Sequence, residues 1–408
     1  MDDPQLLSAI DLLRGEWAEQ SGGQMAVQEI RQEELLAGTN ADLVVFPPLL
    51  LGELCELQRL RPLRPHVLED ETLNYTDFYQ SVRDSLLSYG GHTMALPIGC
   101  PAPLLVSREP QGNQNQKTPP DWSDLSGDKS PVVMSTDSRE VAAAYCFLAR
   151  AVCYAGDNVE GATLFDAASF APRLGEPCFL RALEEVRAGQ VLEPVRSLAN
   201  HQDRSIIAWP VRPQPHPATL ETAGIQVRPL PGAAESYDPL TKAWRPSRRP
   251  HRVTVLGTSG RLIAVSAASR NATSSYALAV WLTSPRNSRQ LVTASPNLAN
   301  VRVSLARSAD DWTGTGDAAL GRQFAEAARD AYLADRTFGF PRLIGAQQYL
   351  TALGAKVCEV ADGVREPAEA LELAIEDWES LTAEIGRERQ QQAYQRHLGL
   401  IAYEPQVR

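Results

Sequence analysis

Patterns typical of helices and of strands alternate along most of this 408-residue chain. Apolar residues at helical spacing or in strict alternation predict the type of each element, and glycines and prolines mark where elements end. Strands are predicted at 25–30, 43–46, 93–96, 104–107, 131–134, 205–210, 225–228, 252–256 and 261–266. Helices are predicted at about 6–17, 50–60, 77–89, 138–154, 178–188, 274–282, 316–333, 343–353 and 371–385. This alternation favours an α/β fold with a largely parallel sheet.

The composition limits the classes of partner. The chain has 39 basic and 50 acidic residues, and its net charge is −11. A surface of this sign repels a phosphate backbone, so we expect no nucleic-acid partner. Hydrophobic residues make up 43% of the chain, which is ordinary for a globular protein. The longest apolar runs, such as 43–51, are much shorter than the roughly 20 residues of a membrane-spanning helix.

Motifs of catalysis are largely missing. The turn at 257–260 lacks the Gly-x-Ser-x-Gly spacing, and the Ser-x-x-Lys match at 126–129 lies in a predicted loop instead of opening a helix. The glycines at 314–316 follow no strand, as a dinucleotide site would need. The six histidines are isolated and the six cysteines contain no Cys-x-x-Cys pair. We therefore expect no enzymatic activity, no cofactor and no metal, and we expect most cysteines to be small buried hydrophobes.

Several ordered segments resemble one family. Residues 40–46 followed by 60–63 are similar to an aspartate, strand and helix element that ends in Leu-x-Pro-Leu, and residues 89–99 are similar to a Gly-Gly-x-x-x-Ala-Leu-Pro segment. Further matches lie at 119–125, 205–210 with 229–232, and 279–286. Together they resemble the extracellular solute-binding proteins of ABC importers, of the carbohydrate-binding, maltose-binding-protein-like family 1. The tail from 378 to 400 is closest to a subgroup associated with planctomycete-type bacteria.

This resemblance implies an α/β, two-lobed periplasmic-binding-protein-like fold of type II, with discontinuous lobes joined by hinge crossings. It places residues 1–105 with 260–303 in an N-terminal lobe, and residues 106–259 with 304–408 in a C-terminal lobe. Crossings between the lobes are expected near 104–109, 251–266 and 301–307. Such a hinge closes on a ligand only as far as the ligand binds the closed form better than the open form.

The resemblance also implies a set of ligand-binding residues. A neutral sugar offers hydroxyls at its edge and apolar C–H groups on its faces, so its site needs aromatic rings and a few polar groups. The expected contacts come from aromatic residues, from the turn at 97–100 and from an Arg-x-Ser pair, namely Phe46, Pro97, Cys100, Trp209, Tyr237, Trp244, Arg302 and Ser304. For each aromatic ring the alternative is an ordinary core position, and for Arg302 it is a surface arginine.

The expected function is capture of a small solute, a carbohydrate, by a monomeric protein that delivers it to an ABC permease. Family members normally begin with a signal peptide and a strand before the first helix, whereas this chain starts at the helix. We expect a leader upstream of Met1 and a periplasmic or membrane-anchored extracytoplasmic location. Two alternatives stay open: a glycoside hydrolase that uses two carboxylates about 5 to 9.5 Å apart, and an intracellular two-lobed sensor or scaffold.

Overall fold

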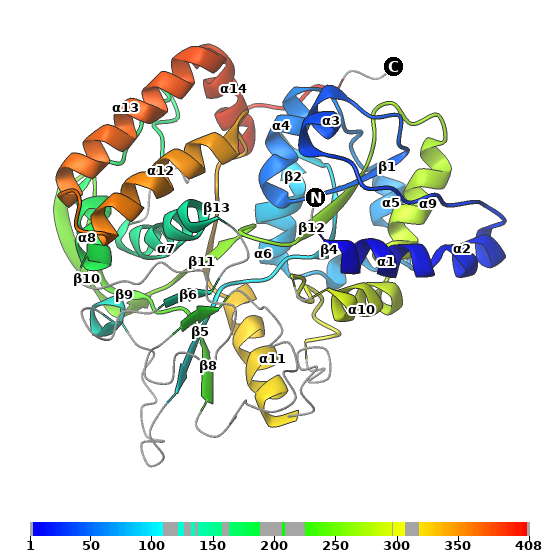
Figure 1. Cartoon of the computed structure of the whole chain (residues 1–408), viewed down its shortest axis with the longest axis horizontal. Helices are drawn as coiled ribbons and strands as arrows, with labels where there is room; N and C mark the ends of the chain where they lie inside the picture. Colours follow the sequence, from blue (N-terminus) through cyan, green and yellow to red (C-terminus); the bar gives the residue numbers. More distant parts are fainter. Residues whose placement is uncertain are drawn as a thin grey trace.

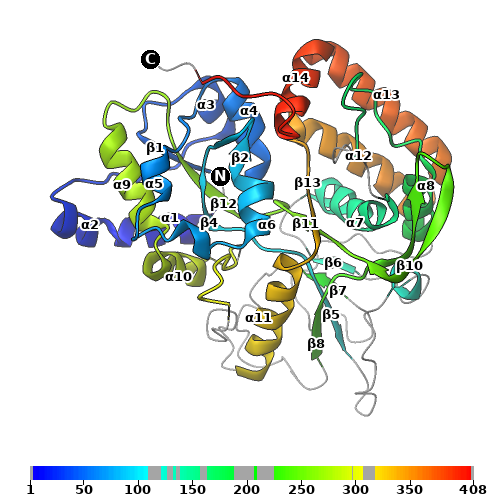
Figure 2. The same ribbon diagram turned by 180° about the vertical axis from the view of Figure 1, so that it is seen from behind.

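Two lobes lie side by side in the computed structural model of the chain, shown in Figure 1 and from behind in Figure 2. The structure describes residues 3–108, 121–125, 132–134, 138–156, 163–187, 206–208, 225–295, 297–306 and 318–405. We call the right-hand lobe of Figure 1 the N-terminal lobe and the left-hand lobe the C-terminal lobe. The predicted two-lobed α/β architecture is confirmed.

The N-terminal lobe surrounds a three-stranded sheet with short helices. Its helices are α1 (Pro4–Leu12), α2 (Arg14–Ser21), α3 (Gln32–Ala37), α4 (Leu51–Glu56), α5 (Pro65–Leu68), α6 (Gln80–Val82), α9 (Ala272–Leu282) and α10 (Pro285–Ala294). Two 3-10 helices, η1 (Pro48–Leu50) and η2 (Tyr75–Asp77), and the π-helix η3 (Arg83–Leu87) also belong to this lobe. The short hairpin of β2 (Ser88–Tyr89) and β3 (His92–Thr93) follows η3.

The sheet of this lobe differs from the largely parallel sheet that we predicted. Its strand order is β1 (Leu43–Phe46), β12 (Arg261–Val265) and β4 (Leu96–Gly99), and the central β12 is antiparallel to both neighbours. The prediction was wrong because β12 enters from the other lobe. The chain returns through β11 (Val253–Leu256) and inserts β12 between two strands that point the opposite way.

Two local predictions in this lobe were also wrong. Residues 25–30 form no strand; among them only Met25 is buried, and no described strand pairs with the stretch. Residues 77–89 are not one helix but the succession of α6, η3 and β2. The helix ends early because the chain must turn at Gly90, whose positive φ of 51° suits a residue without a side chain.

The C-terminal lobe is mostly helical. Its helices are α7 (Arg139–Tyr154), α8 (Pro177–Arg187), α12 (Ala346–Ala361), α13 (Pro367–Ile385) and α14 (Arg387–His397). Helix α7 is buried along nearly its whole length against α8 and α12. Gly354 of α12 permits this approach, because a Cβ there would lie 1.8 Å from the carbonyl oxygen of Glu140.

Strands complete the C-terminal lobe and its connection to the other lobe. The hairpin of β9 (Ala233–Asp238) and β10 (Ala243–His251) lies on the outer edge, and β11 pairs in parallel with β13 (Arg336–Gly339). A four-stranded sheet has the order β6 (Val132–Met134), β7 (Ile206–Ala208), β5 (Leu104–Arg108) and β8 (Ile225–Pro229), and α11 (Ala318–Tyr332) packs on it. The short 3-10 helix η4 (Trp122–Leu125) precedes β6.

Of the two hydrophobic cores, the first lies mainly in the N-terminal lobe and the second in the C-terminal lobe. Leu104 and Val106 contribute to the first core, together with β8 and α11, whereas the intervening Leu105 contributes to the second. This alternation follows from the two-residue period of a strand, so β5 joins both cores. Tyr403 returns the C-terminal segment to the first core. The exact lobe boundaries at 105, 259 and 303 stay a prediction.

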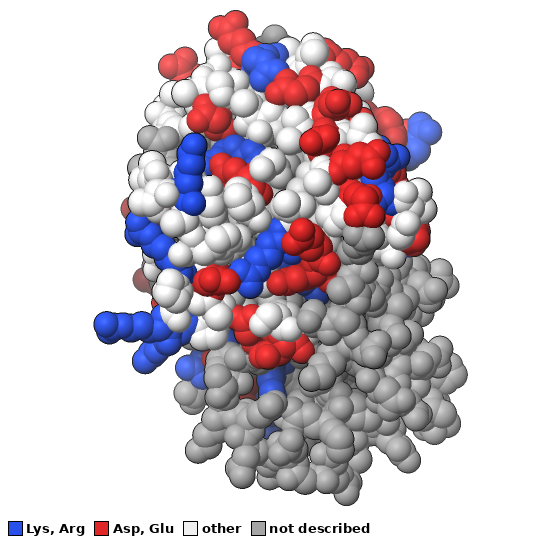
Figure 3. Space-filling view, turned by 90° about the vertical axis from the view of Figure 1, so that its left-hand side faces the viewer, with Lys and Arg blue, Asp and Glu red and all other residues white. Residues whose placement is uncertain are grey.

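Charge is mixed on the outer face of the C-terminal lobe. Figure 3 shows acidic and basic side chains interspersed there. Lys356, for example, lies 3.4 Å from both Glu359 and Asp377. The described part of this face therefore offers no continuous positive surface to a polyanion. None of the helices in the described ranges has the length and apolar character that crossing a bilayer requires.

Candidate functional site

An open groove lies where the two lobes meet, and we call it the junction groove. Gln32, Leu36 and Glu53 of the N-terminal lobe form one wall, and residues of α12 and α13 between 345 and 384 form the other. Its volume is about 670 Å³, within the range of small-molecule sites. The Nε2 of Gln32 donates a hydrogen bond of 3.1 Å to Oε1 of Gln347, so a polar contact already crosses between the walls.

Apolar atoms make up most of the surface of the groove, and several polar side chains lie among them. Besides the two glutamines, its lining includes Glu53, Ser380 and Glu384. Burial raises the pKa of the Glu53 carboxyl, although a backbone hydrogen bond from Gly345 acts in the opposite direction. Amides, hydroxyls and carboxylates can hydrogen-bond a polyhydroxylated solute. No aromatic ring of the described residues lines the groove, which differs from the aromatic site that the resemblance implies.

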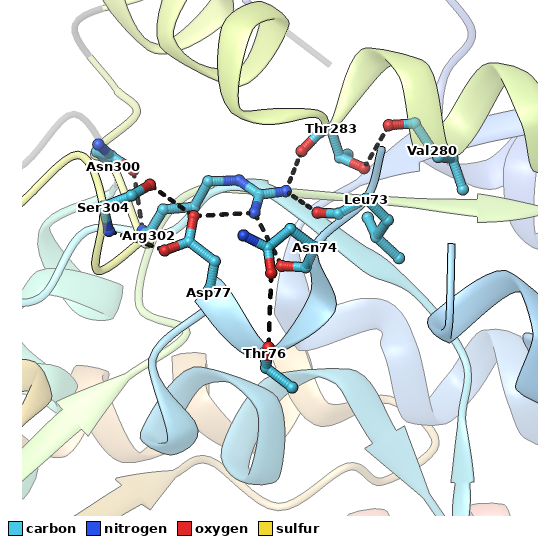
Figure 4. Close-up of polar contacts among 9 residues, drawn as sticks. All are labelled: Leu73, Asn74, Thr76, Asp77, Val280, Thr283, Asn300, Arg302 and Ser304. Carbon is cyan, nitrogen blue, oxygen red and sulfur yellow. Dashed lines mark hydrogen bonds and ion pairs between the residues drawn. The ribbon is translucent and has the colours of Figure 1, made fainter. Parts of the chain in front are cut away.

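Arg302 fastens the segment after α10 to the N-terminal lobe (Figure 4). Its side chain is fully buried and donates to the carbonyl oxygens of Leu73 at 2.9 Å, Asn74 at 3.2 Å and Thr283. Its Nη1 lies 3.3 Å from a carboxylate oxygen of Asp77.

The same carboxylate binds Ser304. The backbone nitrogen and the hydroxyl of Ser304 donate to Asp77 at 2.8 Å and 2.6 Å. The guanidinium of Arg302 also lies 3.8 Å from the ring centre of Phe78. Burial lowers the pKa of Arg302 to about 10, and the hydrogen bond and charge of Asp77 oppose this shift. Arg302 is thus neither a surface arginine nor directed to the groove; it holds the chain where the third lobe crossing is predicted.

Comparison with solved structures identifies the architecture. The sugar-binding protein MalE from the phytopathogen Xanthomonas citri superposes with a TM-score of 0.70 and 15% identity, covering 93% of this chain and 95% of that one. An ABC transporter solute-binding protein from Agrobacterium radiobacter in complex with ribitol superposes with a TM-score of 0.63 and 17% identity, covering 92% of this chain and 96% of that one. Maltose-bound MalE3 from T. maritima superposes with a TM-score of 0.65 and 12% identity, covering 92% of this chain and 97% of that one.

The chain has the fold of these two-lobed binding proteins. No protein-family model matches the sequence, and no curated protein matches it either. The predicted fold is therefore shown by three-dimensional similarity over nearly the whole length, at identities too low to carry a ligand or an activity across.

Within this binding-protein fold, three predicted site residues lie in or beside the N-terminal sheet. Phe46 at the end of β1, Pro97 in β4 and Cys100 are all buried. The Sγ of Cys100 is 3.8 Å from the carbonyl oxygen of Arg261, and burial raises the pKa of its thiol to about 12. Their contact with a ligand stays a prediction that requires the surrounding core to open.

The predicted aromatic residues lie elsewhere. Tyr237 and Trp244 face each other across the β9–β10 hairpin with ring centres 5.7 Å apart, on the outer edge of the C-terminal lobe. The Arg181 guanidinium lies 4.8 Å from the Trp244 ring centre. Trp209 lies outside the described residues. The structure thus does not bring together the seven predicted residues that it describes, and the roles of all eight in binding stay predictions.

Sequence reasoning missed the residues of the junction groove. Gln32, Glu53 and Gln347 lie on short polar helix faces, which in a sequence look like ordinary solvated surface. Only their positions on opposite walls of the groove, one wall from each lobe, identify them as candidate site residues. All six cysteines are free and buried, which confirms the prediction of small buried hydrophobes. In the described ranges no group of three or more His, Cys, Asp or Glu side chains is placed to hold a metal ion.

Proposed function

We propose that this protein captures a small polyhydroxylated solute, a carbohydrate or a sugar alcohol, and delivers it to an ABC permease. The observation that carries the proposal is the junction groove, whose walls come from both lobes of a binding-protein fold. Structural neighbours of this fold were solved with maltose, ribitol and α-D-tagatose. The groove combines an apolar surface with a few amides, hydroxyls and carboxylates, which suits the C–H groups and hydroxyls of the same chemical class.

Binding would proceed by closure of the hinge. A solute held by Gln32 and Glu53 on one wall and by Gln347 on the other interacts fully only when the lobes are together. Its binding free energy therefore shifts the population toward the closed form. The contact between Gln32 and Gln347 must open to admit the solute, and solute hydroxyls replace it. A permease would then recognise the closed lobes.

The protein would bind its solute without converting it. The structural neighbours named above are binding proteins and not enzymes. We further propose an extracytoplasmic location and a monomeric state, as in the sequence-based expectation. The eight predicted contact residues remain part of the proposal, and the groove residues Gln32, Glu53 and Gln347 join them as candidates.

Titration calorimetry tests this function against maltose, maltotetraose, ribitol and tagatose, combined with small-angle scattering of each mixture. We expect saturable binding of at least one solute, accompanied by a smaller radius of gyration. The absence of binding and of compaction across a broad panel of sugars and polyols would contradict the proposal. Release of shorter sugars during incubation would instead favour the glycoside hydrolase alternative.

A further inference from the structure

A second cavity lies between the lobes, on different residues from the junction groove, and we call it the junction cavity. Its volume is about 310 Å³. Asp84 and Ser85 of η3 line it from the N-terminal lobe, and β13, the following loop and α14 line it from the C-terminal lobe. The hydroxyls of Ser85 and Thr337 are 2.6 Å apart, so the two walls touch at one edge. The charged and titratable lining residues include His251, Arg336, Arg342 and His397.

Arg342 differs from the other buried arginines of the described chain. Arg150, Arg302 and Arg342 are 0%, 0% and 6% exposed. Arg150 lies 3.9 Å from Glu185, and Arg302 lies 3.3 Å from Asp77. Among the described residues Arg342 has no carboxylate within ion-pair distance. Its one hydrogen-bond acceptor there is the carbonyl oxygen of Ser85, to which Nη2 donates.

The position of Arg342 is fixed by close packing. Its backbone lies against Gly52 of α4, where a Cβ would come within 2.4 Å of the Arg342 carbonyl group. Burial lowers the pKa of Arg342 to about 10, so the guanidinium still carries its charge at neutral pH. A buried charge without a counter-charge destabilises the folded protein unless a ligand compensates it.

His397 adds a buried ring nitrogen to the same cavity. Its Nδ1 is buried and has no hydrogen-bond partner among the described residues, and its ring stacks on Tyr394 with ring centres 5.9 Å apart. Burial and the charge of Arg342 lower the pKa of His397 to about 3. The imidazole is therefore neutral at pH 7 and offers one donor and one acceptor nitrogen. Arg336 is exposed at the cavity and adds positive charge, while Asp84 is the exposed carboxylate that faces it from the other lobe.

We propose that the junction cavity binds a small oxyanion, a carboxylate or an inorganic phosphate, between Arg342 and His397. A guanidinium presents paired N–H donors that match two oxygens of either anion. The cavity volume of about 310 Å³ admits an anion of this size together with a few water molecules. Ser85 of η3 lines the cavity from the other lobe, and its carbonyl oxygen accepts from Nη2 of Arg342, so the anion lies beside a contact between the lobes. This site shares no lining residue with the junction groove and does not depend on the proposed solute.

Thermal unfolding at constant ionic strength tests the site with phosphate, acetate and succinate, each against chloride. We expect a concentration-dependent rise in Tm for the wild type, and the response to phosphate against the two carboxylates identifies which anion the site takes. In Arg342→Gln the dissociation constant should rise at least tenfold. The matched control is Arg14→Gln, which removes an equal charge from an exposed side chain of α2 that is paired only with Asp11. It should respond like the wild type.

His397→Glu provides an independent variant if Arg342→Gln does not fold. The new carboxylate lies beside Arg342 and takes the place of the anion, so Tm without added anion should rise and the response to anions should disappear. Arg342→Gln and His397→Glu thus lose the same response for opposite reasons. If no anion raises the Tm of the wild type above the chloride reference, or if His397→Glu responds like the wild type, the cavity holds only water and the proposal is wrong.

Discussion

The backbone nitrogen of Tyr403 donates a hydrogen bond of 2.9 Å to the carbonyl oxygen of Gly90, which joins the end of the chain to the hairpin of the N-terminal lobe. The nitrogen of Gly90 in turn donates to the carbonyl oxygen of Arg396 at 3.1 Å. The Tyr403 hydroxyl donates to the carbonyl oxygen of Cys55 at 2.8 Å, and its ring packs edge-on against Tyr89. The C-terminal segment therefore leaves the second core and docks on the first, beyond the three predicted crossings.

Replacement of Gly90 by alanine tests this docking. Gly90 has a φ of 51°, and a Cβ would lie 2.4 Å from the Tyr403 nitrogen. We expect backbone strain at position 90 to lower the free energy of unfolding of Gly90→Ala by about 1 to 2 kcal/mol. Loss of the contacts of the displaced C-terminal segment should lower it further. Urea unfolding measures the free energy, and limited proteolysis measures release of the C-terminal segment.

The matched control is Gly91→Ala. Gly91 has a φ of 82° and no atom within 4 Å of its Cβ position, so this variant carries backbone strain without the clash. It should be less destabilised than Gly90→Ala and should keep its C-terminal segment protected from protease. Equal losses and equal cleavage in the two variants would show that the docked segment contributes nothing.

Arg302→Met should be among the most destabilising single substitutions in the N-terminal lobe. It leaves Asp77 without its cation and removes the guanidinium donor from three backbone carbonyl oxygens, and breaking a buried pair in this way costs about 3 to 5 kcal/mol. Arg286→Met is the control, because that side chain is 78% exposed and its pairing with Glu16 contributes about 1 kcal/mol or less. Similar urea midpoints for the two variants would contradict the role assigned to Arg302.

Ser380→Trp should block solute binding in the junction groove. Ser380 is exposed on α13 and lines the groove, so an indole there occupies the space of the solute. We expect the dissociation constant of whichever solute binds to rise at least tenfold in calorimetry. Ala383→Trp places the same ring on the same helix at an exposed position outside the groove and should bind normally. If the two variants bind equally well, the solute lies elsewhere.

The sequence predicted the elements whose pattern reports a buried face. Strand β1 begins and ends at the predicted residues 43 and 46, and α9, α11 and α13 lie within a few residues of their predicted bounds. The hairpin of β9 and β10 was missed because β10 is half-exposed or exposed along its length and carries prolines, so no alternation marks it. The antiparallel direction of β12 was missed because it depends on a return from the other lobe, which no local pattern encodes.

The candidate site was less predictable than the fold. The resemblance pointed to aromatic residues, yet Tyr237 and Trp244 pack against each other and Arg181 at the outer edge. The junction groove and the junction cavity are built from polar and apolar side chains on helices, strands and loops that meet only in the folded chain. Arg342 shows why the sequence alone could not predict the junction cavity, because the absence of a nearby carboxylate among the described residues depends on how distant segments pack in the folded chain.

The pH dependence of stability should carry the signature of His397. Its pKa is about 3 in the folded protein, against 6.5 for an unperturbed histidine, so between these values the unfolded state binds a proton that the folded state does not. The free energy of unfolding therefore falls as pH drops from 6.5 toward 3, and the contribution is fully present above 6.5. Between pH 7.5 and pH 4.5, in chloride buffers, the wild type should lose about 1 to 2 kcal/mol more than His397→Gln. His66→Gln, at an exposed position on α5, should follow the wild type because it leaves His397 in place. The carboxylates that titrate in this range are common to all three proteins, so their effect on the free energy of unfolding cancels in the comparison. Parallel losses in the wild type and His397→Gln would show that the imidazole is not held neutral beside Arg342.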